Sequence, residues 1–202
     1  MNDIEKLTEY FREFPGIGPR QAKRFVYFLL RKNEQYVREL SALIPQVRKN
    51  VSICENCFKY FTKNINTSKC EICNQNRDNS QILVVARDTD LESIEKSGAY
   101  NGYYFVLGGL LPILEDDVQK FIRFKELLNL IDKKIVNGLE EIILAMNANP
   151  DGDNTAYFLK KNLSDKNIKI TILGRGLSTG SELEYADSET IKNALINRKS
   201  QA

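Results

Sequence analysis

Four cysteines are the residues of this chain whose types and spacing point most clearly to chemistry. They form two Cys-x-x-Cys pairs separated by the twelve residues from Phe58 to Lys69, and they are Cys54, Cys57, Cys70 and Cys73. Two intervening residues let both thiolates of a pair face one ion, and two pairs complete a tetrahedral shell of four sulfurs. Disulfides, a thioredoxin-like redox pair and unrelated buried thiols are the alternatives, but redox motifs occur singly and nothing suggests secretion. The pattern therefore predicts one structural Zn²⁺ per chain, with no ligand position left for a catalytic water.

A second candidate site is a glycine-rich turn near the N-terminus that is followed by basic residues. The run from Phe14 to Phe25 reads Phe-Pro-Gly-Ile-Gly-Pro-Arg-Gln-Ala-Lys-Arg-Phe. Glycine accepts backbone angles that side chains forbid, and proline suits the first turn of a helix. Exposed N–H groups at such a turn bind anions, and a plain helical corner is the alternative interpretation. The residues expected to contact nucleic-acid phosphates are Gly16, Gly18, Arg20, Lys23 and Arg24.

The distribution of charge favours the same end of the chain. The net charge is only +2, but residues 1–53 carry ten Lys and Arg against six Asp and Glu, whereas residues 81–202 carry fifteen against eighteen. A polyanion is therefore expected to dock at the N-terminal end, although a solvated helical surface would also account for this surplus.

Length and composition set the fold class. A chain of 202 residues with 42% hydrophobic content can bury one or two cores. Apolar spacing predicts helices over about the first dozen residues and over 34–47, which together with the basic turn make a small helical domain. The most apolar stretch, from Tyr103 to Leu114, is too short to cross a membrane and is broken by glycine and proline. We therefore expect a cytoplasmic protein with no membrane partner.

After the cysteines, the pattern changes to alternating strands and helices. Apolar runs that read as buried strands cover 81–86, 103–107, 141–145 and 168–173. Helices fit between them at about 90–96, 118–134 and 154–163. This alternation predicts a parallel sheet with helices on its faces and ligands beyond the carboxyl ends of the strands.

Carboxylates follow two of these strands. Asp88 and Asp90 come after the first strand, and Asp151 and Asp153 flank Gly152 after the third. Such a cluster could hold Mg²⁺ for phosphoryl transfer. The alternative is structural, with Asp153 capping the next helix and Asp151 shaping the turn. Because the chain has no histidine and no evident nucleophile beside a base, catalysis is not favoured.

The last segment is a glycine-rich run, 174–187, followed by a predicted helix from Ser188 to about Asn197, with Ser188 as its cap. The run lacks the Gly-Lys-Ser/Thr ending of a phosphate loop, which argues against nucleotide hydrolysis.

In this order, the helical hairpin, the four-cysteine knuckle, the sheet and the Glu-Leu-Glu-Tyr-Ala-Asp tail resemble the RecR family of bacterial recombination mediators. The resemblance covers nearly the whole chain. It implies an α+β multidomain protein with a helix-hairpin-helix DNA-binding domain, a zinc finger, a Toprim-like domain, and a C-terminal segment with a helix. The corresponding ranges are 1–53, 54–78, 79–175 and 176–202.

The resemblance also implies a function. Family members are non-catalytic DNA repair proteins that work with RecO, and in some bacteria RecF, to load recombinase onto gapped single-stranded DNA. They bind single- and double-stranded DNA and assemble into ring-like homotetramers. By this resemblance Asp88, Asp151 and Asp153 form a partner-binding surface or a weak Mg²⁺ site, and Leu183 and Tyr185 make oligomer contacts.

Two departures from the family pattern concern these surfaces. A Toprim domain has Glu at the end of its first strand, where this chain has Ala86 followed by Arg87, and the usual Gly-Leu-Pro of the tail ends here in Ser178. Two rival functions remain: a Mg²⁺-dependent Toprim nuclease or primase-like enzyme, which Ala86 argues against, and a zinc-stabilised interaction module without a DNA role.

Overall fold

The computed structural model describes residues 1–63, 67–115, 117–180 and 182–198. Predictions that fall on 64–66 in the link between the cysteine pairs, on Ser181 in the glycine-rich run and on 199–202 of the last segment lie outside the described residues. The chain packs as two compact units, Met1–Val51 and Ser52–Ala202, and each is described by itself. The finer division into four predicted segments stays a prediction.

The first unit consists of three helices, α1 (Asp3–Arg12), α2 (Pro19–Leu30) and α3 (Glu34–Asn50). Asn2 caps α1 by accepting the Glu5 N–H at 2.9 Å, and Glu5 returns the bond to the Asn2 N–H. Phe11 of α1 packs edge-on against Phe25 of α2, with ring centroids 5.6 Å apart. The three predicted helical segments are confirmed, and α3 continues three residues beyond the predicted end.

The second unit is built on a four-stranded sheet in the order β4-β3-β5-β6, and all three pairings are parallel. The strands are β3 (Asp78–Val85), β4 (Gly102–Val106), β5 (Glu141–Ala145) and β6 (Lys169–Ile172). Val85 of β3 lies between Val106 of β4 and Ala145 of β5, so the carboxyl ends of these three strands are level. The predicted parallel sheet is confirmed.

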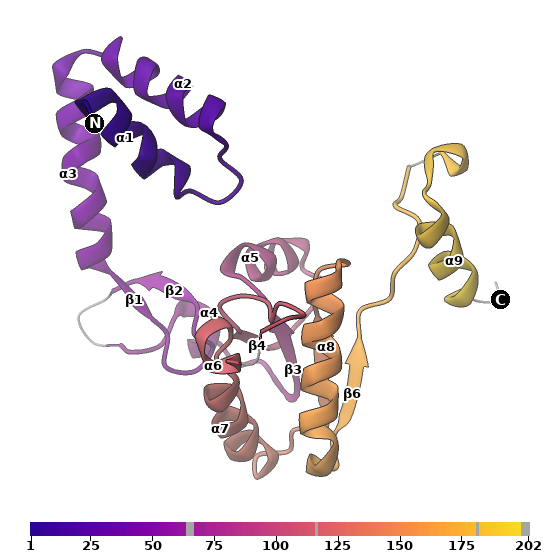
Figure 1. Cartoon of the computed structure of the whole chain (residues 1–202). Helices are drawn as coiled ribbons and strands as arrows, with labels where there is room; N and C mark the ends of the chain where they lie inside the picture. The colour runs from indigo at the N-terminus through magenta and orange to yellow at the C-terminus, as the bar shows by residue number, and fades with distance from the viewer. Residues whose placement is uncertain (64–66, 116, 181, 199–202) are drawn as a thin grey trace. The chain divides into compact units, whose positions relative to one another are not determined.

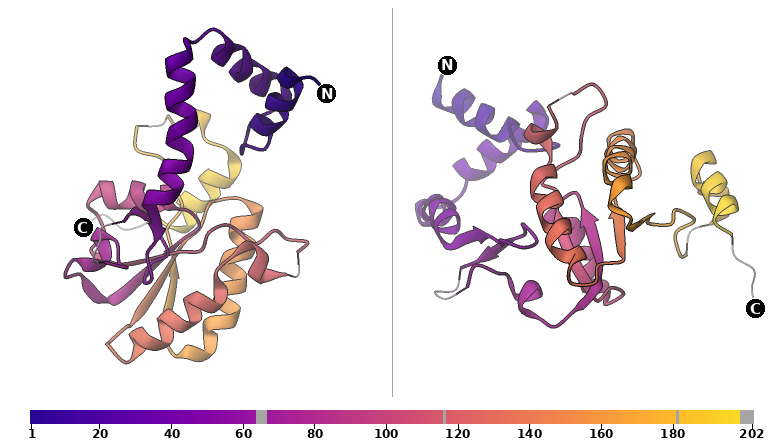
Figure 2. Two further views of the ribbon diagram at one scale, coloured as in Figure 1. Left: turned by 90° about the vertical axis from the view of Figure 1, so that its left-hand side faces the viewer. Right: turned by 90° about the horizontal axis from the view of Figure 1, so that it is seen from below.

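Alternate residues of β3 enter two separate cores. Ile82 and Val84 pack with Leu127 of α7 (Phe124–Ile135) and Leu159 of α8 (Pro150–Leu163), so these two helices cover one face of the sheet (Figure 1 and Figure 2). Leu83 and Val85 pack with α5 (Asp88–Ser97) and with the cysteine module on the opposite face. That module consists of a two-stranded sheet and a short helix, namely β1 (Val51–Ile53), β2 (Tyr60–Thr62) and α4 (Glu71–Asn74).

The predicted continuous helix over 118–134 is wrong. It is divided into α6 (Val118–Phe121) and α7 by the extended residue Ile122, which is buried, and by Arg123. The Arg123 N–H donates to the carbonyl of Leu107 at 2.9 Å, and its guanidinium donates to the carbonyl of Val106 at 3.0 Å. The helix is interrupted here because Arg123 donates to backbone carbonyls at the end of β4, and its N–H is therefore not used for a helical hydrogen bond.

Two predicted helix starts also need correction. Helix α8 begins at Pro150 rather than at 154, and its cap is Asn149, whose side chain accepts the Gly152 N–H at 2.8 Å. Helix α9 (Ser188–Ile196) is capped by Asp187, not by Ser188. In both cases the residue immediately before the first helical residue carries the acceptor. The remaining elements are two short 3₁₀ helices, η1 (Ser164–Lys166) and η2 (Leu183–Tyr185).

Among the described residues, no helix combines the length and the apolar character that crossing a membrane requires.

Candidate functional site

The structure brings the four predicted cysteines together in one buried cluster. Their sulfur atoms all lie within 4.8 Å of one another, and none of the four side chains takes part in a disulfide. Cys54 and Cys57 are fully buried, and Cys70 and Cys73 are 2% and 8% exposed. Among the described residues this is the only group of three or more acidic or thiol ligands close enough to share one ion.

Two tight turns position the sulfur atoms. The first pair is held by a turn in which the Phe58 N–H donates to the Cys54 carbonyl at 3.0 Å, with Phe58 at a φ of 62°. The second pair opens α4, where Cys70 lies at the N-cap position and its N–H donates to Cys54 Sγ at 3.3 Å. Ser68 joins the two turns through a 2.6 Å hydrogen bond to the Glu55 carboxylate.

This donor set fits a tetrahedral zinc ion. Zn–S bonds of about 2.3 Å place the four sulfurs about 3.8 Å apart, which is compatible with the observed cluster. Hydrogen bonding with Cys57 lowers the pKa of Cys54, and the same interaction raises the pKa of Cys57, as expected of neighbouring thiols that share protons when no metal is bound. Four protein ligands leave no position for substrate or water, so the site can only hold structure.

The cluster is joined to the sheet through backbone and side chain. The Val106 N–H at the end of β4 donates to the Cys57 carbonyl at 2.8 Å. Asp88, at the start of α5, accepts the Tyr60 N–H of β2 at 2.8 Å. Asp88 is predicted as part of a partner or Mg²⁺ surface, and this role stays a prediction, while the structure shows one of its oxygens bonded to the cysteine module.

The N-terminal turn has the geometry expected of an anion site. Gly16 has a φ of +75°, and the Ile17 N–H closes the turn on the Phe14 carbonyl at 3.0 Å. Gly18 is the N-cap of α2 but has no side chain to satisfy the first N–H groups, and a Cβ there would meet nothing within 4 Å. The first turn of α2 carries no acidic residue.

The three predicted basic residues follow this turn on the exposed side of α2. Arg20, Lys23 and Arg24 are exposed, whereas Ala22 and Val26 on the opposite side are buried. Arg24 donates to Gln21 Oε1 at 3.3 Å, which leaves the rest of its guanidinium toward solvent. The structure therefore brings the predicted cations together beside the uncapped helix start.

The acidic residues after the strands do not gather into a metal site. Asp90 accepts the Arg87 N–H at 2.9 Å and so closes the first turn of α5. Asp153 receives two hydrogen bonds from Arg175, one of them at 3.5 Å, and this contact raises the pKa of Arg175. Ala86, at the position of the Toprim glutamate, is fully buried. Asp151 lies with Asp153 in the first turn of α8.

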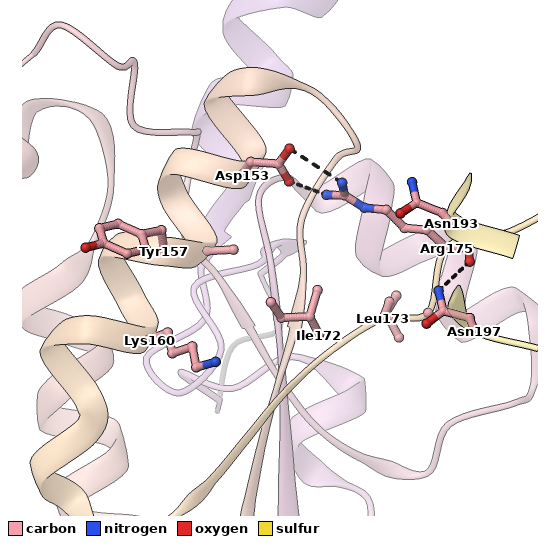
Figure 3. A pocket seen from close by; sticks show the side chains of 10 residues that line it. Asp153, Tyr157, Lys160, Ile172, Leu173, Arg175, Asn193 and Asn197 are labelled. Carbon is pink, nitrogen blue, oxygen red and sulfur yellow. Dashed lines mark hydrogen bonds and ion pairs between the residues drawn. The ribbon is translucent and has the colours of Figure 1, made fainter. Parts of the chain in front are cut away.

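Arg175 is a functional candidate that sequence reasoning missed. It follows β6 and borders a cavity of about 460 Å³ between α8, β6 and α9 (Figure 3). Figure 3 shows its guanidinium directed at Asp153, while its carbonyl accepts the Asn197 side chain at 2.7 Å. No local pattern identifies this residue, because its partners lie 22 positions away on either side.

The predicted oligomer contacts lie on the surface of their own chain. Leu183 is 62% exposed and Tyr185 is 79% exposed, both in η2.

Comparisons with known proteins agree with this arrangement. The sequence matches family models described as "RecR, helix-hairpin-helix" over residues 4–48, "Toprim domain" over 80–174 and "RecR, C-terminal" over 176–199. A recombination protein RecR from Bdellovibrio bacteriovorus is 35% identical over 199 residues, covering 96% of each chain. Proteins of the same name from Chloroflexus aggregans and Lactobacillus johnsonii are each 36% identical over 197 residues, covering 97% and 96% of this chain and 93% and 96% of theirs. The chain therefore belongs to the RecR family of recombination proteins.

Proposed function

We propose that this chain is a non-catalytic mediator of recombinational DNA repair in the cytoplasm. It binds gapped DNA through its single- and double-stranded parts as a ring-like homo-oligomer, with a tetramer expected. Together with RecO, and RecF where present, it helps to load recombinase onto the single strand. Membership of the RecR family supports the repair role, and the finer statements rest on the residues below.

The observation that carries the proposal is the uncapped start of α2 beside three exposed cations. Backbone N–H groups and the positive end of a helix dipole attract a phosphate oxygen. Gly18 leaves room for close approach, since a Cβ there would have no atom within 4 Å apart from those of Gly18 itself and its two chain neighbours. Arg20, Lys23 and Arg24 add charge without reaching a base edge, so binding is expected to be independent of sequence.

The cysteine cluster has a structural role in this proposal. We assign it one Zn²⁺ held by the four thiolates, which ties β1, β2 and α4 together and fixes them to the end of β4. Zinc supplies no chemistry to DNA here, because every coordination position is taken by sulfur.

The acidic turn at the start of α8 serves as a partner surface rather than a catalytic centre. Ala86 removes the carboxylate that would complete a Mg²⁺ cluster, and Asp88, Asp90 and Asp153 are engaged by Tyr60, Arg87 and Arg175. These contacts favour the mediator over the rival nuclease or primase-like enzyme, since phosphoryl transfer needs carboxylates that are free to bind metal. Asp151 and Asp153 remain the acidic residues that a basic surface of RecO would meet.

The test is DNA binding by the triple variant Arg20→Ala, Lys23→Ala, Arg24→Ala across a salt series. We expect weaker binding to gapped and duplex DNA alike, and a salt slope flattened by roughly 0.7 to 0.9 per lost phosphate contact. The matched control is Arg38→Ala, Arg48→Ala, Lys49→Ala, which removes three exposed cations from α3 of the same unit. Equal losses of DNA affinity in both triple variants would show that the loss comes from the lower net charge and not from the α2 site. Unchanged affinity and slope in the α2 variant would leave the interaction module without a DNA role as the better proposal.

A further inference from the structure

The C-terminal tail, defined here as residues 176–198, is attached to the sheet without a buried core of its own. None of its described residues is buried, and Leu195 and Ile196 of α9 are 59% and 66% exposed. The half-buried positions of α9 include Ile191 and Ala194. Apolar burial therefore contributes little to docking of the tail, and polar contacts take on more weight.

Those polar contacts meet at Arg175, between the end of β6 and the tail. Its guanidinium bonds to Asp153 in the first turn of α8, and its carbonyl accepts the Asn197 side chain at the end of α9 (Figure 3). The Arg175 side chain is 27% exposed and that of Asp153 is 54% exposed. One residue thus joins the body of the unit to both the start and the end of the tail.

We propose that the Arg175–Asp153 pair is a latch that docks the tail, and that a cationic group which takes Asp153 releases it. A half-exposed ion pair is weak enough to exchange partners at ordinary salt concentrations. Asp153 cannot accept Arg175 and a cation from a binding partner in the same geometry at once. Cation binding at the start of α8 and docking of the tail therefore oppose each other, and by linkage each weakens the other to the same degree.

The consequence for assembly follows from what the tail carries. Leu183 and Tyr185 lie in the sequence between Arg175 and α9, so release of the latch would free the segment that carries these exposed side chains. This consequence rests on the proposed partner role of the Asp151–Asp153 turn and the proposed oligomer contacts. The latch itself does not, and it is tested without a partner.

The test is amide hydrogen exchange of α9 in full-length, zinc-loaded protein. Asp153→Asn and Arg175→Gln should each speed exchange in α9 by about two- to fivefold, as expected for loss of a partly exposed ion pair. Exchange around Leu159 and Leu163, which are fully buried in α8, should stay as in the wild type. Asp132→Asn is the matched control, because Asp132 is also 54% exposed and pairs with Lys166 in the same unit.

Two further measurements separate a latch from a general loss of stability. The double reversal Asp153→Arg, Arg175→Asp should restore slow exchange in α9. Raising salt from about 0.1 M to about 1 M, which shortens the screening length from about 10 Å to about 3 Å, should speed α9 exchange in the wild type but not in Arg175→Gln. The latch would be overturned if α9 exchanged at the wild-type rate in both single variants. It would also be overturned if α9 of the double-reversal variant exchanged no more slowly than in either single variant. Both outcomes are independent of the DNA-binding test.

Discussion

At the scale of single residues, the two glycines of the N-terminal turn have different reasons to be glycine. Gly16 has a φ of +75°, a conformation that side chains disfavour, so the fold itself requires glycine there. Gly18 has an ordinary φ of −82° and open space around it, so nothing inside the protein excludes a side chain. Its identity is better explained by a ligand that approaches the backbone.

We therefore predict that substitutions at these two positions differ in their effects on stability and on DNA affinity. Gly16→Ala should lower stability by about 1 kcal/mol through backbone strain. Gly18→Ser should leave stability unchanged or raise it by a few tenths of a kcal/mol, because serine caps helices well. The same serine occupies the N–H groups offered to phosphate, and DNA affinity should fall about tenfold, as for loss of one charge-assisted hydrogen bond. Chemical unfolding and DNA titration of both variants test this, and full DNA binding by a stable Gly18→Ser protein would contradict it.

The cysteines lead to a prediction about metal content. Cys57→Ser should remove most of the zinc and lower the free energy of unfolding by several kcal/mol, since metal binding is part of folding in such a site. The backbone bond from Val106 to the Cys57 carbonyl survives this substitution, so the loss reports the thiolate. Elemental analysis and thermal unfolding measure the two effects. Less than about half an equivalent of zinc in unchelated wild-type protein would count against the site.

A further prediction is that the protein has no phosphoryl-transfer activity, and Asp151 is the residue with which to test it. We expect no Mg²⁺-dependent DNA cleavage or primer synthesis by the wild type, because Ala86 leaves the carboxylate set incomplete and no general base is evident. The assay uses gapped and single-stranded DNA with and without Mg²⁺. Activity in the wild type that disappears in Asp151→Asn would reinstate the Toprim enzyme.

At the scale of elements, a nearly buried ion pair braces the segment that follows the cysteine module against α5. Arg77, which lies between α4 and β3, has a side chain that is 5% exposed. It donates two hydrogen bonds to Glu95 of α5, one of them at 3.0 Å. Burial is the largest single influence on Glu95 and would raise its pKa, but hydrogen bonding, Arg77's above all, and the positive charges of Arg77 and Lys59 together outweigh it, and the pKa is lowered. This Arg77–Glu95 ion pair, called the brace below, therefore requires the ionised carboxylate of Glu95.

This brace predicts a stability difference that depends on pH. Glu95→Gln should lower the free energy of unfolding by about 2 kcal/mol near neutral pH, because a nearly buried guanidinium loses its counter-charge. A carboxyl whose pKa is lower in the folded state stabilises fully above its unfolded pKa of about 4.3, and this stabilisation is lost as pH falls through the folded value. The difference in the free energy of unfolding between wild type and variant should therefore disappear at acidic pH.

Urea unfolding at several pH values measures this gap. Glu92→Gln is the control, because Glu92 is on the same helix and 61% exposed, and its loss should cost less than about 1 kcal/mol. A gap for Glu95→Gln that persists unchanged below pH 4 would show that the carboxylate charge is not the cause.

At the scale of the whole molecule, the exposed side chains of the tail are the basis for a prediction about assembly. Leu183 and Tyr185 are more than half exposed within their own chain, and exposed apolar patches are a common mark of interaction surfaces. A second subunit is the cover that the family resemblance implies.

Truncation after Leu177 should therefore reduce the assembly to smaller species. Light scattering coupled to size exclusion measures the molar mass, and zinc content serves as the check that the second unit is folded. An unchanged molar mass would mean that the tail packs on its own chain and that the oligomer forms elsewhere.

The sequence by itself determined the features that depend on neighbours along the chain. The spacing of Cys54, Cys57, Cys70 and Cys73 is sufficient to predict one shared site, since two turns bring the thiols together. Period-two and near-continuous apolar runs locate β3 to β6, and the order of strands and helices implies a parallel sheet. The Gly-Ile-Gly-Pro turn is likewise local, so α2 begins at Pro19 as predicted.

Only the tertiary structure decided which distant side chains meet. The break at Ile122 and Arg123 exists because the end of β4 needs a donor, which no helical pattern reveals. Asp88 braces β2 across 28 residues, and Asp153 pairs with Arg175 across 22, although both were equally good metal ligands by sequence alone. A carboxylate is stabilised by whichever donor the fold places beside it, and that choice is made by topology over distances that periodicity and spacing do not encode.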